Sequence, residues 1–225
     1  MFFRNTSSKT RCADQPLTVP SRLVSGLLMT LAALALLVGS ASVQAGPTEA
    51  EARELVQSTA ESVIREIREH QADVKDDPQA LLAIVDRLLL PHVDAERMTQ
   101  LVLGRYYRGA SAAQRQAFTE QFQRLLVRTY AGPLSALGNQ EITITGTKPG
   151  GADDELIVES EVSGGDLGVV PVGYRLAPVD GEWKSYDVIV DGISLVNNYR
   201  GSFAQKIQRD GLDGLIDTLA EQNVD

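Results

Sequence analysis

The sequence of 225 residues contains a single cysteine, Cys12, and two histidines, His70 and His92. Cys12 precedes the first long apolar run, so the chain after that run has no thiol for a disulfide, a nucleophile or a metal ligand. No segment carries the His-Glu-x-x-His pattern of zinc hydrolases, and no serine stands in a Gly-x-Ser-x-Gly turn. We therefore expect no catalytic triad, metal or cofactor, and we interpret both histidines as structural or solvated.

Basic residues are also scarce, with 21 Lys and Arg against 30 Asp and Glu. Four of the basic residues and Asp14 lie within residues 1–45, which leaves 17 basic and 29 acidic residues and a net charge near −12 for the rest. Such a balance opposes binding to nucleic acid, which depends on clustered Lys and Arg, and attachment to anionic lipid head groups. The sequence itself shows no basic cluster.

Long hydrophobic runs are missing apart from residues 23–38, which are 16 residues long. Basic residues precede this run, and small residues ending at Ala45 follow it. This layout predicts a cleaved signal peptide over residues 1–45 and export to the periplasm. A transmembrane anchor is the alternative, although spanning a bilayer takes about 20 apolar residues.

The first half of the remaining chain has the periodicity of amphipathic helices. We predict helices over residues 48–73, 78–90, 94–104 and 111–130. Thr48 with Glu51 and Ser111 with Gln114 have the spacing of capping boxes, and Asp94 is a good N-cap. Gly132-Pro133 is expected to bend or end the fourth helix, and residues 138–139 to close the helical half.

From Glu141 the period changes to two, which predicts four antiparallel strands. Turns are expected at residues 148–154 and 164–166, and Asp180-Gly181 is a strong hairpin signal. Gly192 ends the last strand and Ser194 caps a C-terminal helix, followed by a second helix from Leu212 to about residue 221. Helices followed by strands indicate the α+β class, with N-terminal and C-terminal helices packed on a sheet of about four strands.

Alternation assigns apolar residues of three strands to one face each: Leu156 and Val158; Val170, Val172 and Tyr174; Tyr186, Val188 and Val190. Asp187 and Asp191 share the opposite side of the last strand. They could form an acid–base pair, but we interpret them as charges on a solvated face. Composition alone leaves open whether the apolar faces close on each other or leave a cavity.

Three stretches resemble the MlaC family of periplasmic phospholipid carriers: residues 97–108, residues 118–130 and the block 186–216. The most specific part is Tyr186-Asp-Val, then Gly192-Ile-Ser-Leu, Asn198-Tyr-Arg and Gly211-Leu-Asp-Gly-Leu. The resemblance implies one MlaC-like domain over residues 46–225, a curved antiparallel sheet wrapped against helices in an NTF2-like cone with a hydrophobic cavity. It also implies phospholipid as cargo, with acyl chains inside and the head group outside, which agrees with the lack of a basic cluster.

As partners the resemblance implies an outer-membrane lipoprotein–porin complex and an inner-membrane ABC transporter with its membrane-anchored substrate-binding subunit. Lipid carriage between them would maintain outer-membrane lipid asymmetry. Two other functions stay open, a periplasmic enzyme of isomerase or dehydratase type on the same cone and a lipid-free envelope adaptor. By resemblance, the residues expected to contact lipid tails, each of which could instead be ordinary core, are Leu156, Val158, Val170, Val172, Tyr174, Tyr186, Val188, Val190 and Ile193.

Overall fold

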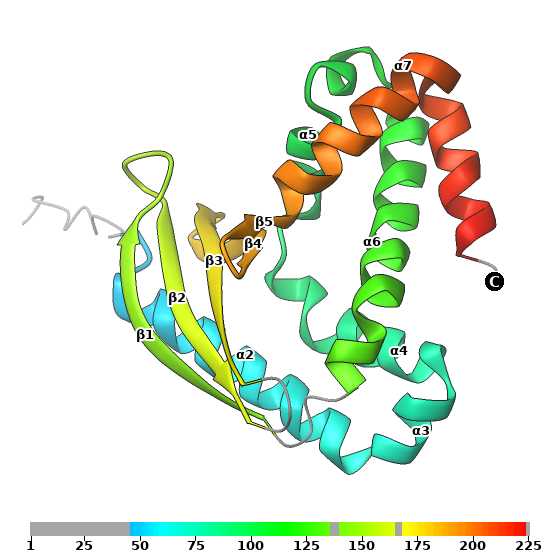
Figure 1. Cartoon of the computed structure of the whole chain (residues 1–225). Coiled ribbons are helices and arrows are strands. Elements are labelled where there is room, and N and C mark those ends of the chain that lie inside the picture. The colour runs from blue at the N-terminus through cyan, green and yellow to red at the C-terminus, as the bar shows by residue number, and fades with distance from the viewer. Residues whose placement is uncertain (1–45, 136–139, 165–167, 224–225) are drawn as a thin grey trace, which may run out of the picture. The chain divides into compact units, whose positions relative to one another are not determined.

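The computed structural model describes residues 46–135, 140–164 and 168–223 (Figure 1). The predicted signal peptide and the predicted turn residues 138–139 and 165–166 lie outside the described residues. None of the described helices combines the length and the apolarity needed to cross a membrane.

The helical half begins with α2 (Glu49–Glu69), α3 (Gln71–Asp76), α4 (Pro78–Leu88) and the 3₁₀ turn η1 (Leu90–His92). The capping box of Thr48 and Glu51 is confirmed, because each side chain accepts a hydrogen bond from the other residue's backbone N–H. The single helix expected over residues 48–73 is wrong. It ends at Glu69, and His70, with φ −113° and ψ 27°, separates it from α3. Neither glycine nor proline marks this break.

Two further segments precede the sheet, α5 (Ala95–Leu103) with the 3₁₀ segment η2 (Gly104–Gly109), and α6 (Ala112–Ser135). The Asp94 side chain accepts from the Arg97 N–H, and Ser111 and Gln114 exchange the hydrogen bonds of a capping box, as predicted. The expected end of α6 near residue 130 is wrong, since the helix continues through Gly132-Pro133 to Ser135. One proline removes one helical hydrogen bond, and a long helix that packs on its neighbours tolerates this loss.

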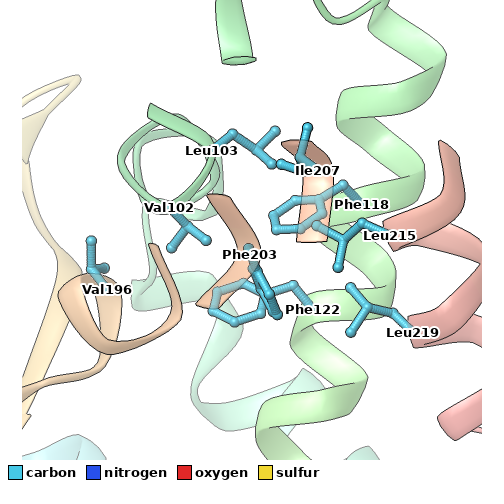
Figure 2. Packing of buried hydrophobic residues seen from close by; sticks show 9 residues of the cluster. All are labelled: Val102, Leu103, Phe118, Phe122, Val196, Phe203, Ile207, Leu215 and Leu219. Atoms are coloured by element: carbon cyan, nitrogen blue, oxygen red, sulfur yellow. The ribbon is translucent and has the colours of Figure 1, made fainter. Parts of the chain in front are cut away.

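The C-terminal helix α7 (Leu195–Gln222) changes direction at Gly211, whose φ of 77° and ψ of 172° are not helical. This kink confirms the two predicted C-terminal helices, the second starting at Leu212. A left-handed φ favours glycine because it has no Cβ to clash with the backbone. The kink lets Leu215 and Leu219 pack beside the aromatic residues of α6 (Figure 2).

Helices α5, α6 and α7 share an aromatic-rich core (Figure 2). Phe118 and Phe122 stack with their ring centroids 5.6 Å apart, and Phe203 meets both rings edge-on at 5.7 Å. Offset and edge-on ring pairs each add about 0.5–1.5 kcal/mol to the effect of burial. This core is built entirely from helices.

The sheet is antiparallel with strands in chain order: β1 (Glu141–Pro149), β2 (Leu156–Ser163), β3 (Val169–Val179), β4 (Glu182–Val190) and the short β5 (Ile193–Ser194). The Asp180-Gly181 hairpin is confirmed, with φ values of 53° and 84°. Asp191-Gly192 repeats this geometry with 50° and 79°, which adds a fifth strand to the four expected. Both turns have the positive φ values that two-residue hairpins require.

The α+β class is confirmed, and the layout is consistent with an NTF2-like cone. In Figure 1 the long strands bend and α2 runs across one side of the sheet. Bulges between Ile144 and Gly146 of β1, and opposite Arg175 and Leu176 in β4, interrupt the regular register. Bulges bend the strand that carries them and increase its twist.

Candidate functional site

The apolar faces of β2, β3 and β4 form one continuous surface. Tyr174 of β3 lies between Val158 of β2 and Val188 of β4, and Val172 pairs with Val190. Val190 in turn pairs with Ile193 of β5. Residues directly opposite each other in antiparallel strands point to the same face. The sequence-based prediction that these strands are neighbours with a shared apolar face is therefore confirmed.

One part of this face is covered by α2. Val158 and Leu176 are 0% and 1% exposed, and they pack with Trp183 against Ala52 and Val56 of the helix. The Trp183 indole N–H donates to the Thr48 carbonyl at 2.8 Å, which holds the start of α2 on the sheet. This part is an ordinary closed core.

The next part of the same face is only half-buried. We call it the open face, and it consists of Val170, Val172, Tyr174, Val188 and Val190. Tyr174 packs at the edge of the α2 core, whereas the four valines belong to none of the hydrophobic clusters formed by the described residues. Beyond them Ile193 is 60% exposed. Accessibility of the face thus rises from the α2 core towards the β4–β5 turn.

Tyr174 marks the boundary between the closed and the open part. Its side chain is partly accessible, yet burial raises the pKa of its hydroxyl. A phenol whose pKa is raised by desolvation stays neutral over the physiological range. Its ring therefore adds apolar surface to the open face and no charge.

Tyr186 does not continue this face, and its predicted grouping with Val188 and Val190 is wrong. The β4 bulge pairs Arg175 with Asp187 and Leu176 with Ser185, which leaves Tyr186 out of the register. Its hydroxyl donates to a Glu155 carboxylate oxygen at 2.7 Å. The Arg97 guanidinium carbon lies 3.9 Å from the centre of its ring, a cation–π contact.

Glu155 is the centre of this polar group and is 6% exposed. It forms an ion pair with Arg97 and accepts from the backbone N–H groups of Gly151 and Ala152 at 2.9 and 3.1 Å. Burial alone would raise the pKa of Glu155, but the hydrogen bonds from Arg97 and Tyr186 outweigh it and lower that pKa. Burial and the Glu155 carboxylate raise the pKa of Tyr186 to about 12. The carboxylate is thus kept ionised and the phenol neutral.

Asp187 is buried, so its interpretation as a solvated charge is wrong. Asp187 is 1% exposed. Its carboxylate accepts hydrogen bonds from the Val196 N–H at 3.0 Å and from the Ser194 hydroxyl at 2.6 Å. Ser194 itself accepts from the Asn197 N–H. A negative charge at a helix N-terminus satisfies free N–H groups and complements the helix dipole. Asp187 therefore anchors α7 to the sheet, whereas Asp191 is exposed in the turn.

A hollow of about 370 Å³ lies along α5, lined by Arg97, Gln100, Leu101, Gly104, Tyr107, Arg108 and Arg200. The expectation that the chain has no basic cluster is therefore wrong in three dimensions. Arg200 is about a hundred positions from the other two arginines, and the packing of α7 beside α5 brings them together.

The remaining candidates for chemistry stay apart. His70 is exposed, with Glu66 and Asp73 oxygens 3.7 and 3.6 Å from its ring nitrogens. His92 lies in η1. Across residues 46–135, 140–164 and 168–223, no three Asp, Glu, His or Cys side chains gather as a metal site would require.

The matching family model is described as "MlaC protein" and covers residues 57–221 of the chain. The chain belongs to the MlaC family. This confirms the resemblance noted in residues 97–108, 118–130 and 186–216, all of which lie within the matched range.

Individual relatives agree with this membership. The chain is 35% identical over 205 residues to the toluene tolerance protein ttg2D of Pseudomonas putida, covering 89% of this chain and 90% of that protein. It is 31% identical over 171 residues to the intermembrane phospholipid transport system binding protein MlaC of Haemophilus influenzae, covering 74% and 79%. A phospholipid-binding protein from Ralstonia solanacearum, solved in complex with a phospholipid, superposes with a TM-score of 0.72 at 30% identity over 77% of this chain and 97% of that one.

Proposed function

We propose that this MlaC family member is a phospholipid carrier that holds acyl chains against the open face. One observation carries the proposal. The apolar face that α2 covers at one end continues onto valines that are only half-buried and belong to none of the core clusters of the described residues. The phospholipid bound to the Ralstonia relative supports the same ligand class.

The physics of carriage explains why such a face is needed. Two acyl chains expose about 30 methylenes, and moving them through water unshielded would cost about 25 kcal/mol at about 0.8 kcal/mol each. Side chains that are apolar and already dehydrated on one side can offset most of this cost. Val170, Val172, Tyr174, Val188 and Val190 meet this requirement, whereas Val158 is sealed beneath α2 and Tyr186 serves the Glu155 group. We place the exposed Ile193 at the open end of the tail site. Leu156 pairs with the buried Leu176 and packs against the α2 core, so we leave it outside the tail site.

We further propose that the carrier works in the periplasm, after cleavage of residues 1–45, between an outer-membrane lipoprotein–porin complex and an inner-membrane ABC transporter. The predicted leader and the name of the Haemophilus relative, a binding protein of an intermembrane phospholipid transport system, support this placement. In this role the protein would contribute to outer-membrane lipid asymmetry and would catalyse no reaction.

The test is to change one side of β3 and leave the other intact. The protein is exported, purified without detergent and extracted, and its phospholipid is quantified by mass spectrometry next to a thermal melt. We expect Val172→Glu to fold and to lose most of the lipid, because a carboxylate among acyl chains must be desolvated or draw in water, a cost of several kcal/mol. Val158→Glu should instead fail to fold, since its charge would be buried without a partner.

Val169→Glu is the matched control. Val169 is 61% exposed and precedes Val170 in the same strand, so its side chain points to the opposite face. This variant should keep the wild-type amount of lipid. A folded Val172→Glu protein with wild-type lipid would refute the tail site. A wild-type protein purified without any phospholipid would refute the carrier function and favour the enzyme or adaptor.

A further inference from the structure

The arginine hollow along α5 brings together cations from three elements. Arg97 belongs to α5, Arg108 to η2 and Arg200 to α7. The chain is acidic overall, with a formal net charge of −9. A concave positive site on an acidic protein attracts anions to one place, because the surrounding surface repels them.

Among the described residues, only one of the three arginines has a side-chain partner. Arg97 is engaged by Glu155 and by the ring of Tyr186. Arg108 and Arg200, both exposed, form no ion pair or side-chain hydrogen bond within the part of the chain that the structure describes. The nearby Glu96 carboxylate already accepts from the Tyr107 hydroxyl at 3.0 Å. The hollow therefore holds donors whose charge the described residues do not compensate.

The backbone also leaves space for the Arg200 guanidinium. Gly104, which ends α5 with a φ of 53°, faces it so closely that an added Cβ would lie 3.1 Å from the Arg200 Nε. A cation beside a helix C-terminus is favoured by the carbonyl groups that end there. The glycine thus leaves room for Arg200 at the hollow, and the helix end favours its charge there.

We propose that the arginine hollow binds a phosphate group. A guanidinium presents paired N–H donors that match two oxygens of a phosphate, and a phosphate group offers oxygens in several directions to several such donors. A carboxylate, by contrast, is matched by a single guanidinium, as the Glu155 carboxylate is matched by Arg97. The amide of Gln100 adds a neutral donor to the lining.

The phosphate could come from a lipid head group or from free phosphate, and the chemistry of the site is the same for both. The site stands on its own charges and does not require that the open face carries lipid. If the wild-type protein did not bind phosphate, the proposed carrier function would still stand. If the wild-type protein carried no lipid, the proposed phosphate site would still stand.

The experiment titrates inorganic phosphate into the exported, ¹⁵N-labelled protein at constant ionic strength and follows the arginine Nε–H signals by NMR. The test variant is Arg108→Gln with Arg200→Gln. The control is Arg124→Gln with Arg128→Gln, which removes two exposed arginines of α6 and the same net charge. We expect saturable shifts in wild type and control, and at least about tenfold weaker binding for each guanidinium removed from the hollow.

A parallel measurement of copurified phospholipid assigns the source. Less lipid in the test variant than in the control supports the head group as ligand, and equal lipid supports free phosphate. Equal phosphate affinity in both double variants would overturn the proposal, and so would shifts that chloride reproduces at the same ionic strength.

Discussion

Replacing Asp187 tests whether this buried carboxylate holds the C-terminal helix. In Asp187→Ala the Val196 N–H and the Ser194 hydroxyl lose their acceptor, and Val196 is itself only 5% exposed. A buried donor left unpaired costs about 1–3 kcal/mol, and loss of a charge at a helix N-terminus costs about 0.3–1 kcal/mol more. Relief of carboxylate desolvation offsets part of this sum. We expect a loss of about 1–3 kcal/mol in the free energy of unfolding.

Urea denaturation followed by far-UV circular dichroism measures this loss directly. For a domain of this size each kcal/mol lowers the melting temperature by about 2–4 °C, so a melt should shift by about 2–12 °C. Asp187→Asn should lose less, because its amide oxygen can still accept from Val196.

Asp191→Asn is the matched control on the same strand end. Asp191 is exposed with a φ of 50°, a conformation that asparagine adopts readily. We expect its stability to stay within about 0.5 kcal/mol of wild type, as for most surface changes. An Asp187→Ala protein as stable as the Asp191→Asn protein would refute the capping role.

Two further predictions concern the Glu155 group and the α7 kink. The pKa of Glu155 is lowered in the fold, so its ionised form adds stability that is complete above the unfolded pKa of about 4.3 and is lost as pH falls through the lower folded value. The stability advantage of wild type over Glu155→Gln should therefore shrink on acidification below about pH 4.3, and an advantage independent of pH would contradict this. Gly211→Ala should destabilise by about 1–2 kcal/mol because of its positive φ, whereas Gly201→Ala, in open space on the same helix, should stabilise by about 0.5–1 kcal/mol. Equal effects of the two alanines in thermal melts would argue against the kink.

The open face was predictable because its determinants are local. Strict alternation assigns Val170, Val172 and Tyr174 to one side, and the Asp180-Gly181 turn fixes which residues of β4 lie opposite them. The face of Tyr186 was predicted wrongly because a bulge adds one residue to a strand, and the sequence does not show where. Side chains on the two sides of a bulge no longer follow one common alternation between the faces.

Asp187 and the arginine hollow were missed for different reasons. A carboxylate in a strand is expected to be solvated unless its partners are known. Two of the partners of Asp187, Ser194 and Val196, lie beyond a turn that brings them back to it. The hollow depends on Arg200 meeting α5, a contact set by packing between helices far apart in sequence. The helix break at His70 could not be predicted because no glycine or proline stands there. Pro133 predicted the end of a helix, but α6 continues past it.

The three hydrophobic clusters of the described residues share no member. One joins α5, α6 and α7, one joins α2 to the sheet, and one joins α2, α3 and α4. Regions that do not share a core can open separately, and native-state hydrogen exchange detects such units by their different opening free energies. Amides of α6 and α7 should thus exchange with one opening free energy and those of β2 and β3 with another. A ligand that lies between two such units would slow the hydrogen exchange of both. Their opening free energies would then rise together, and this joint rise would show that the protein has bound its ligand.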